Sequence, residues 1–261
     1  MAYGGSNGGP APDGTQKRPA GGGLFSPGGR ESLLGFDLAF GEALAGLDEA
    51  GRGPLAGPLV AAAAVLDLGS TYPGVDDSKK LSPEARGRAA LLIKERAVAW
   101  AVAAKTPAEV DSLNPLMASM LAMAEAFSSL PAKPGLALAD GNAAPPVSGA
   151  RVVTVVRGDA RSLSIAAASI LAKTARDAMM EELDRLYPLY GFARHKGYGT
   201  REHLEAIARH GPSPAHRLSF RGAGGPAGPK GPSGSKGRGG AGGQGGTEGP
   251  DGTEWSRGGL F

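Results

Sequence analysis

The chain has 261 residues, of which 41% are hydrophobic and 20% are charged, and its formal net charge is +3. It contains no cysteine, so disulfide bonds are excluded. The small basic excess permits contact with a phosphate backbone, but charge alone does not indicate that function.

Composition divides the chain into three parts. We predict a flexible leader over residues 1–33, one α/β domain over 34–220 and a Gly-rich low-complexity tail over 221–261. The leader is rich in Gly, Pro and Ala and has no apolar core, so we expect neither a signal peptide nor a membrane span. We therefore expect a soluble, cytoplasmic protein.

The first predicted element of the domain is an apolar strand that ends in Asp48 and Glu49. Successive side chains of a strand point to opposite faces, so the two acids can share a site only if the strand ends there. The segment from Gly51 to Pro54 supplies the necessary turn. The pair then indicates a metal site, and the alternative is an acidic strand end capped by solvent or by Arg52.

The remaining elements alternate between strands and helices. Ser82 followed by Pro83 predicts a helix start, Thr106 with Glu109 predicts a capping box, and Asn114-Pro115 predicts a break. The predicted strands cover 59–66 and 97–103, and the predicted helices cover 82–96, 164–186 and 200–210. This order favours an α/β fold with a central mixed sheet flanked by helices, and with a helical C-terminal part.

Two further acids follow apolar runs of strand length. Asp140 comes after the run 136–139, and Asp159 comes after 152–156 with Arg157 and Gly158 between. Each Asp can be a plain turn residue. If the strands lie side by side, however, four carboxylates converge, and such a cluster stays ionised only around a cation. Oxygen ligands predict Mg²⁺ or Mn²⁺.

The segments that contain these acids belong to a larger set of short motifs spread along the chain. The motifs are Gly46 to Pro58, Asp76 to Ser82, Asp140-Gly141-Asn142, Gly158 to Lys173, His195 to Thr200 and Gly211 to Phe220. Together they cover Ala45 to Phe220, and in this combination the chain resembles a bacterial ribonuclease HII. The resemblance implies the ribonuclease H-like fold.

The resemblance also implies an activity. It implies an endonuclease that hydrolyses the RNA strand of RNA-DNA hybrids and nicks 5′ of single ribonucleotides in duplex DNA, leaving 5′-phosphate and 3′-hydroxyl ends. Two metal ions would be held by Asp48, Glu49, Asp140 and Asp159. The second ion can depend on substrate, because a bound phosphate supplies oxygens. A non-catalytic scaffold that binds RNA/DNA junctions is the alternative.

The resemblance assigns substrate contacts as well. Gly51-Arg52-Gly53 would read the junction through its backbone, and Tyr198 would pack against the neighbouring deoxyribose. Turn formation by the glycines and half-buried packing of the tyrosine are the alternatives. Candidate phosphate contacts, each equally readable as a solvated charge, are Lys79, Lys80, Lys173, His195, Lys196 and Arg217.

Two features separate the chain from the sister family, ribonuclease HIII. That family carries a folded domain ahead of the catalytic one and a Glu at the last acidic position. Here the leader is Gly-rich and the last acid is Asp159. Both features favour ribonuclease HII.

The tail has glycine at every third position from Gly222 to Gly252. This period is the collagen signature, but additional glycines raise the entropy lost on ordering, so we predict a disordered linker and a monomer, with a trimer as the alternative. The chain ends in Leu260-Phe261. This ending resembles clamp-binding peptides, so a DNA sliding clamp is a candidate partner.

Overall fold

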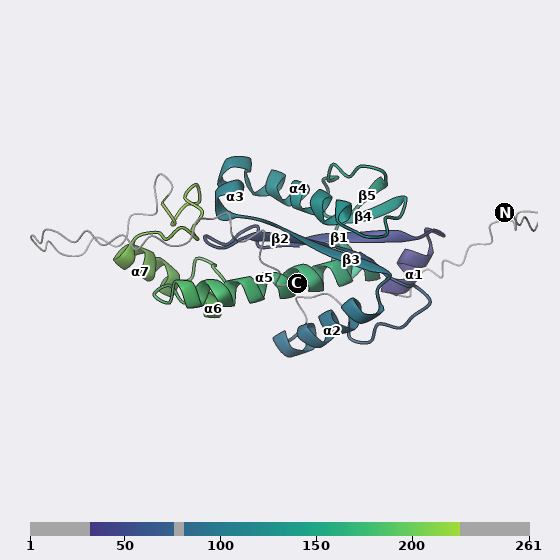
Figure 1. Ribbon diagram of the computed structural model, residues 1–261, viewed down its shortest axis with the longest axis horizontal. Helices are drawn as coiled ribbons and strands as arrows, with labels where there is room; N and C mark the ends of the chain where they lie inside the picture. Colours follow the sequence, from purple (N-terminus) through teal and green to yellow (C-terminus); the bar gives the residue numbers. More distant parts are fainter. Residues whose placement is uncertain (1–31, 76–80, 225–261) are drawn as a thin grey trace, which may run out of the picture. The chain divides into compact units, whose positions relative to one another are not determined.

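The computed structural model describes residues 32–75 and 81–224, so most of the predicted leader and most of the predicted tail lie outside the described residues. A five-stranded sheet with the order β3-β2-β1-β4-β5 forms the centre (Figure 1). The strands are β1 (Leu44–Ala50), β2 (Leu59–Val65), β3 (Ala99–Lys105), β4 (Leu136–Asp140) and β5 (Arg151–Val155). The first three strands pair antiparallel, whereas β4 is parallel to β1 and β5 is parallel to β4. The predicted mixed sheet is confirmed.

Helices cover both faces of the sheet (Figure 1). On one face, α3 (Pro107–Leu113) and α4 (Pro115–Ser128) pack their apolar side chains on the sheet, as Phe127 and Met123 illustrate. On the other face lie α1 (Leu33–Leu38), α2 (Pro83–Arg96) and the long α5 (Leu163–Leu186). The small residues 166–168 of α5 are fully buried, which allows close packing on β1 and β2.

Capping residues set the helix boundaries where the sequence predicts them. The Ser82 hydroxyl accepts from the Ala85 amide, and Thr106 with Glu109 forms the predicted capping box. Asn114 adopts φ +66°, ends α3 and caps α4 with its side chain. The Asn114-Pro115 break therefore divides two helices.

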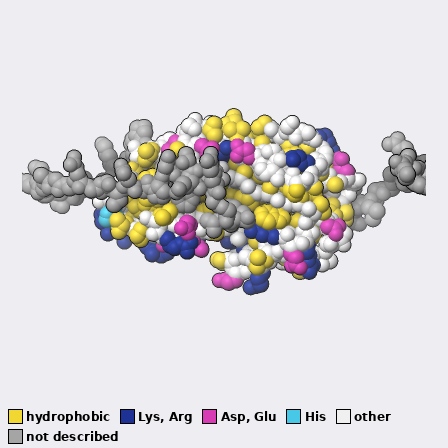
Figure 2. Space-filling model, viewed as in Figure 1, with side chains coloured by type: hydrophobic (Ala, Val, Ile, Leu, Met, Phe, Trp, Pro, Cys, Tyr) yellow, Lys and Arg dark blue, Asp and Glu magenta, His cyan; other side chains and the backbone are white. Residues whose placement is uncertain are grey.

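The C-terminal part consists of α6 (Phe192–His195), α7 (Arg201–His210) and an irregular segment that extends beyond Phe220 to the buried Ala223. The sequence did not predict α1 or α6. Among residues 32–75 and 81–224, none of the helices combines the length and apolar character needed to cross a bilayer. In the face seen in Figure 2, Lys and Arg side chains stand in small groups beside Asp and Glu.

The contact between β1 and α5 is unusually close. A Cβ atom at Gly46 would lie 2.1 Å from the backbone carbonyl carbon of Ser164, so only glycine fits there. The strand that carries Asp48 is thereby fixed against the helix that carries Ser169 and Lys173. This contact determines where the site described below forms.

Candidate functional site

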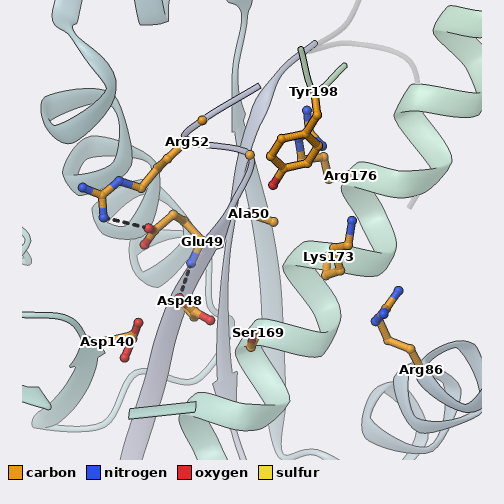
Figure 3. Close-up of a pocket in the computed structure, with 12 residues that line it drawn as sticks. Asp48, Glu49, Ala50, Arg52, Arg86, Asp140, Ser169, Lys173, Arg176 and Tyr198 are labelled. Carbon is orange, nitrogen blue, oxygen red and sulfur yellow. Dashed lines mark hydrogen bonds and ion pairs between the residues drawn. The ribbon is translucent and has the colours of Figure 1, made fainter. Parts of the chain in front are cut away.

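Strand β1 carries Asp48 and Glu49 to the edge of a cavity (Figure 3). Asp48 is 5% exposed, and its Oδ1 accepts a hydrogen bond of 2.7 Å from the Glu49 amide. The Glu49 carboxylate instead accepts from Arg52 Nη1 at 3.2 Å. The contact between Glu49 and Arg52 is the one that the alternative interpretation of this strand end predicted.

Asp140 reaches the same cavity from the neighbouring strand. It is the last residue of β4, which pairs with β1 in parallel. Its Oδ1 accepts a 2.6 Å hydrogen bond from the Gly158 amide, which joins it to the 3₁₀ turn η1 (Gly158–Ala160). Asp159 lies in that turn, is 4% exposed and is not among the cavity residues. The structure therefore brings three of the four predicted acids to one cavity and places Asp159 beside them in η1.

The cavity has a volume of about 310 Å³. Carboxylates lie on one side of it, Lys173 and Arg86 on another, and Tyr198 with Arg176 at a third (Figure 3). Its lining residues are Asp48, Glu49, Ala50, Gly51, Arg52, Gly53, Arg86, Asp140, Ser169, Lys173, Arg176 and Tyr198.

Sequence analysis gave no role to Arg86, Ser169 or Arg176. The spacing of 169, 173 and 176 on one helix face is the signal that could have found two of them, because Lys173 was already a candidate. Arg86 comes from α2 on another part of the chain, and no local pattern marks it.

Burial and like charge both disfavour the ionised form of Asp48. Burial, then the charge of Glu49 and then that of Asp140 raise its pKa well above the ordinary value, while hydrogen bonds from the Ser169 hydroxyl and the Glu49 amide act in the opposite direction. A bound cation would relieve this repulsion. The donor set is made only of carboxylate oxygens, so it fits a hard divalent ion such as Mg²⁺ or Mn²⁺.

The acids are near one another without forming a closed coordination shell. Within the part of the chain that the structure describes, no three His, Asp or Glu side chains are grouped as tightly as a metal ion needs. One cause is visible in Figure 3, where Glu49 turns toward Arg52.

Cations lie along the helix side of the cavity. Asp177 accepts from Lys173 Nζ at 2.6 Å and from Arg86 Nη1 at 3.4 Å, which holds these two cations beside each other. Lys196 pairs with Glu181 at 2.9 Å and is not a cavity residue. The predicted phosphate contacts Lys79 and Lys80 lie outside the described residues.

The predicted junction-reading residues also line the cavity. Gly51 has φ +94°, and a Cβ atom there would lie 2.1 Å from Arg176 Nε. A Cβ atom at Gly53 would meet nothing within 4 Å. Tyr198 is 48% exposed, whereas Tyr190 is buried and packs against Phe192.

Two candidate phosphate contacts are wrong. Arg217 is fully buried, and its guanidinium donates only to backbone carbonyls of residues 51, 52 and 57. His195 is 9% exposed, and its Nε2 lies 2.7 Å from the carbonyl oxygen of Tyr190. Both side chains are occupied inside the fold, so neither is available to a phosphate.

His216 makes the unfolding free energy depend on pH. Burial, followed by the charge of His203, lowers the pKa of His216 from 6.5 to about 4. Because the unfolded chain binds a proton near pH 6.5 and the folded chain does not, the contribution is complete above pH 6.5 and is lost as the pH falls toward 4. We expect a loss of about 2 kcal/mol between about pH 7 and about pH 5, measured by denaturant titration.

His216→Asn is the control, and its stability should change less over the same pH range. Equal unfolding free energies for the wild type at both pH values would contradict this account.

The described domain is similar in sequence to proteins of one known family. Residues 45–223 match the family model for Ribonuclease HII. The chain is 55% identical over 180 residues to ribonuclease HII of Chromobacterium violaceum, which covers 68% of this chain and 89% of that protein. It is 53% identical over 197 residues to the enzyme of Chlorobium luteolum, covering 74% of this chain and 93% of that protein.

Solved structures agree. The ribonuclease H2 of Pyrococcus horikoshii superposes with a TM-score of 0.60 at 29% identity, covering 69% of this chain and 95% of that one. Ribonuclease HII of Archaeoglobus fulgidus, solved in complex with PCNA, gives 0.58 at 28% identity, covering 68% and 95%. A ribonuclease HIII matches with 0.52 at 22% identity over 69% of this chain and 68% of that one, which shows the shared fold. The chain belongs to the ribonuclease HII family.

Proposed function

We propose that this enzyme cuts on the 5′ side of single ribonucleotides in duplex DNA as well as within longer RNA-DNA hybrids, leaving 5′-phosphate and 3′-hydroxyl ends. Its family makes it a ribonuclease H enzyme that acts on RNA-DNA hybrids. The cavity that joins carboxylates to the Gly51-Arg52-Gly53 loop and Tyr198 is the observation that supports the finer specificity.

Ribonuclease H enzymes depend on divalent metal ions, and we propose Mg²⁺ or Mn²⁺ here, two ions in all, held by Asp48, Glu49, Asp140 and Asp159. When bound, such ions activate the attacking water and stabilise charge on the phosphate and the leaving 3′ oxygen. Asp48 and Asp140 would provide buried or half-buried oxygens, and Glu49 would add its own once its contact with Arg52 is broken. A phosphate of the substrate can complete the second ion's shell.

The Gly51-Arg52-Gly53 loop and Tyr198 would recognise the substrate. A ribose is recognised by its 2′-hydroxyl, which backbone groups can contact where no side chain intervenes. Gly53 offers such a position, since the space around its missing Cβ is open. Tyr198 presents an exposed ring to the next deoxyribose, and Lys173 faces the cavity as a phosphate contact. Lys196, which does not line the cavity, and Lys79, which lies outside the described residues, stay predicted phosphate contacts.

Cleavage of a labelled DNA duplex with one ribonucleotide tests the proposal. We expect a nick just 5′ of the ribonucleotide with Mg²⁺ or Mn²⁺, none with EDTA, and none with Asp140→Asn. A wild type that binds this duplex but never cuts it with either metal would favour the scaffold alternative over catalysis at this site.

Partner and assembly are further proposals. A clamp complex is known for the Archaeoglobus fulgidus relative, and we propose clamp binding through Leu260-Phe261, which lies outside the described residues. Equal pull-down by the clamp of the full chain and a chain without its last four residues would contradict it. The monomeric state, the cytoplasmic location and the division at residues 33 and 220 also stay predictions, and sedimentation of the intact chain tests the first.

A further inference from the structure

The segment from Ser213 to Phe220 has no role in the proposed chemistry. Its backbone nevertheless contacts residues 55–57, which follow the Gly51-Arg52-Gly53 loop. His216 forms a β-bridge with Ala56, and the Arg217 amide donates to the Leu55 carbonyl at 2.8 Å. The Leu55 amide in turn donates to the Gly197 carbonyl at 2.8 Å. Residues 55–57 are thus held between the 213–217 segment and the loop that contains Tyr198.

Arg217 holds the Gly51-Arg52-Gly53 loop by its carbonyl groups. Nη2 donates to the Gly51 carbonyl at 2.7 Å, Nη1 donates to the Arg52 carbonyl at 3.0 Å, and Nε and Nη2 both donate to the Gly57 carbonyl at 3.1 and 2.9 Å. No ion pair joins Arg217 to an acid within residues 32–75 or 81–224. Burying a charged guanidinium costs desolvation free energy, and the hydrogen bonds from Arg217 to these carbonyls offset that cost.

His216 holds Tyr198 through a second histidine. The Ser213 amide can only donate, so at 2.9 Å it assigns the acceptor role to His216 Nδ1 and the proton to Nε2. That Nε2 lies 3.0 Å from His203 Nε2, which accepts, and His203 Nδ1 then donates to the Tyr198 carbonyl at 2.9 Å. The chain of hydrogen bonds fixes the backbone from which the exposed Tyr198 ring projects.

We propose that His216 and Arg217 are positioning residues that fix the Gly51-Arg52-Gly53 loop and Tyr198 relative to each other. The two residues are adjacent in sequence, and each serves one of the two elements that face the ribonucleotide junction. This inference rests on the proposed function, because it assumes that these elements read the substrate. Correct spacing between them then sets the preference for a single ribonucleotide.

Arg217→Lys tests the first contact. Lysine keeps the positive charge but lacks the planar set of donors that reaches three carbonyls at once. We expect the ratio of kcat/KM on a single-ribonucleotide duplex to kcat/KM on a continuous hybrid to fall about tenfold or more. A smaller folded fraction lowers both values equally, so it leaves this ratio unchanged. The matched control is Arg209→Lys on the exposed face of α7, which should keep the wild-type ratio.

His216→Asn tests the second contact independently. Asparagine can still accept from the Ser213 amide, but it cannot donate to His203 in the same way. The same ratio should fall, and hydrogen exchange should accelerate at residues 196–199. If Arg217→Lys does not fold, this variant decides the proposal by the same measurements.

Hydrogen exchange separates the failure of this inference from the failure of the proposed function. In Arg217→Lys we expect faster exchange at residues 51–57 and unchanged exchange in α4. A wild type that does not cut at the single ribonucleotide would refute the proposed function, and the exchange pattern would still decide whether His216 and Arg217 position the loops. Wild-type ratios and wild-type exchange in both variants would overturn the inference.

Discussion

Asp48→Asn should lower the cleavage rate about a thousandfold or more while leaving the metal-free protein at least as stable as the wild type. The substitution keeps the size of a 5% exposed side chain and removes a charge that burial, Glu49 and Asp140 all disfavour. It also removes an anionic oxygen from the proposed metal ligands. The loss corresponds to about 4 kcal/mol of transition-state stabilisation.

Thermal unfolding with and without Mn²⁺ tests whether Asp48 contributes to metal binding. A ligand that binds only the folded state raises Tm, so we expect Mn²⁺ to raise the Tm of the wild type more than that of Asp48→Asn. Asp67→Asn is the control, because Asp67 lies in an exposed turn after β2 and should keep full activity. An Asp48→Asn enzyme within tenfold of the wild-type rate would remove Asp48 from the site.

Alanine at the two glycines around Arg52 should give opposite results. Gly51→Ala should destabilise the fold by about 3 to 5 kcal/mol, because Gly51 has φ +94° and a Cβ there would lie 2.1 Å from Arg176 Nε and 2.8 Å from the Pro58 carbonyl oxygen. Gly53→Ala should change stability by less than about 1 kcal/mol, since nothing lies within 4 Å of its Cβ position.

Cleavage kinetics of Gly53→Ala distinguish a contact between Gly53 and the ribose from a role in the turn alone. If its backbone approaches the ribose, the added methyl of Gly53→Ala should raise KM or lower kcat by about tenfold or more on the single-ribonucleotide duplex. Circular dichroism melts and kinetics on the same preparations measure both effects. Wild-type kinetics for Gly53→Ala would restrict the role of that glycine to the turn.

Local chemistry explains which parts of the fold the sequence predicts. Pro83, the Thr106 capping box and the Asn114-Pro115 break act within a few residues, so the sequence reveals them directly. The helix α6 has four residues between Gly191 and Lys196, both in left-handed conformations, and so short a helix has no periodicity to detect. The mixed sheet follows from the alternation of elements, but the order of its strands depends on contacts between distant segments.

The same distinction applies to the site. Asp48, Glu49 and Asp140 are visible because each follows an apolar run, and the structure places them together. The sequence predicts a surface or phosphate-binding charge at Arg217, because the partners of this side chain are backbone carbonyls more than 150 positions away and carbonyls carry no sequence signal. A buried arginine without an acidic partner cannot be recognised from its neighbours in the chain.

The parallel pairing of β1 with β4 has a consequence for the order of folding. Strands β1 to β3 pair in sequence and can form while the chain is still being synthesised, but β4 can join β1 only after β2, α2, β3, α3 and α4 have been made. Asp48 therefore meets Asp140 only after this long-range contact forms. A nascent chain that ends before Leu136 has Asp48 and Glu49 but lacks Asp140 and Asp159, so the proposed set of metal ligands is complete only after synthesis has passed Asp159.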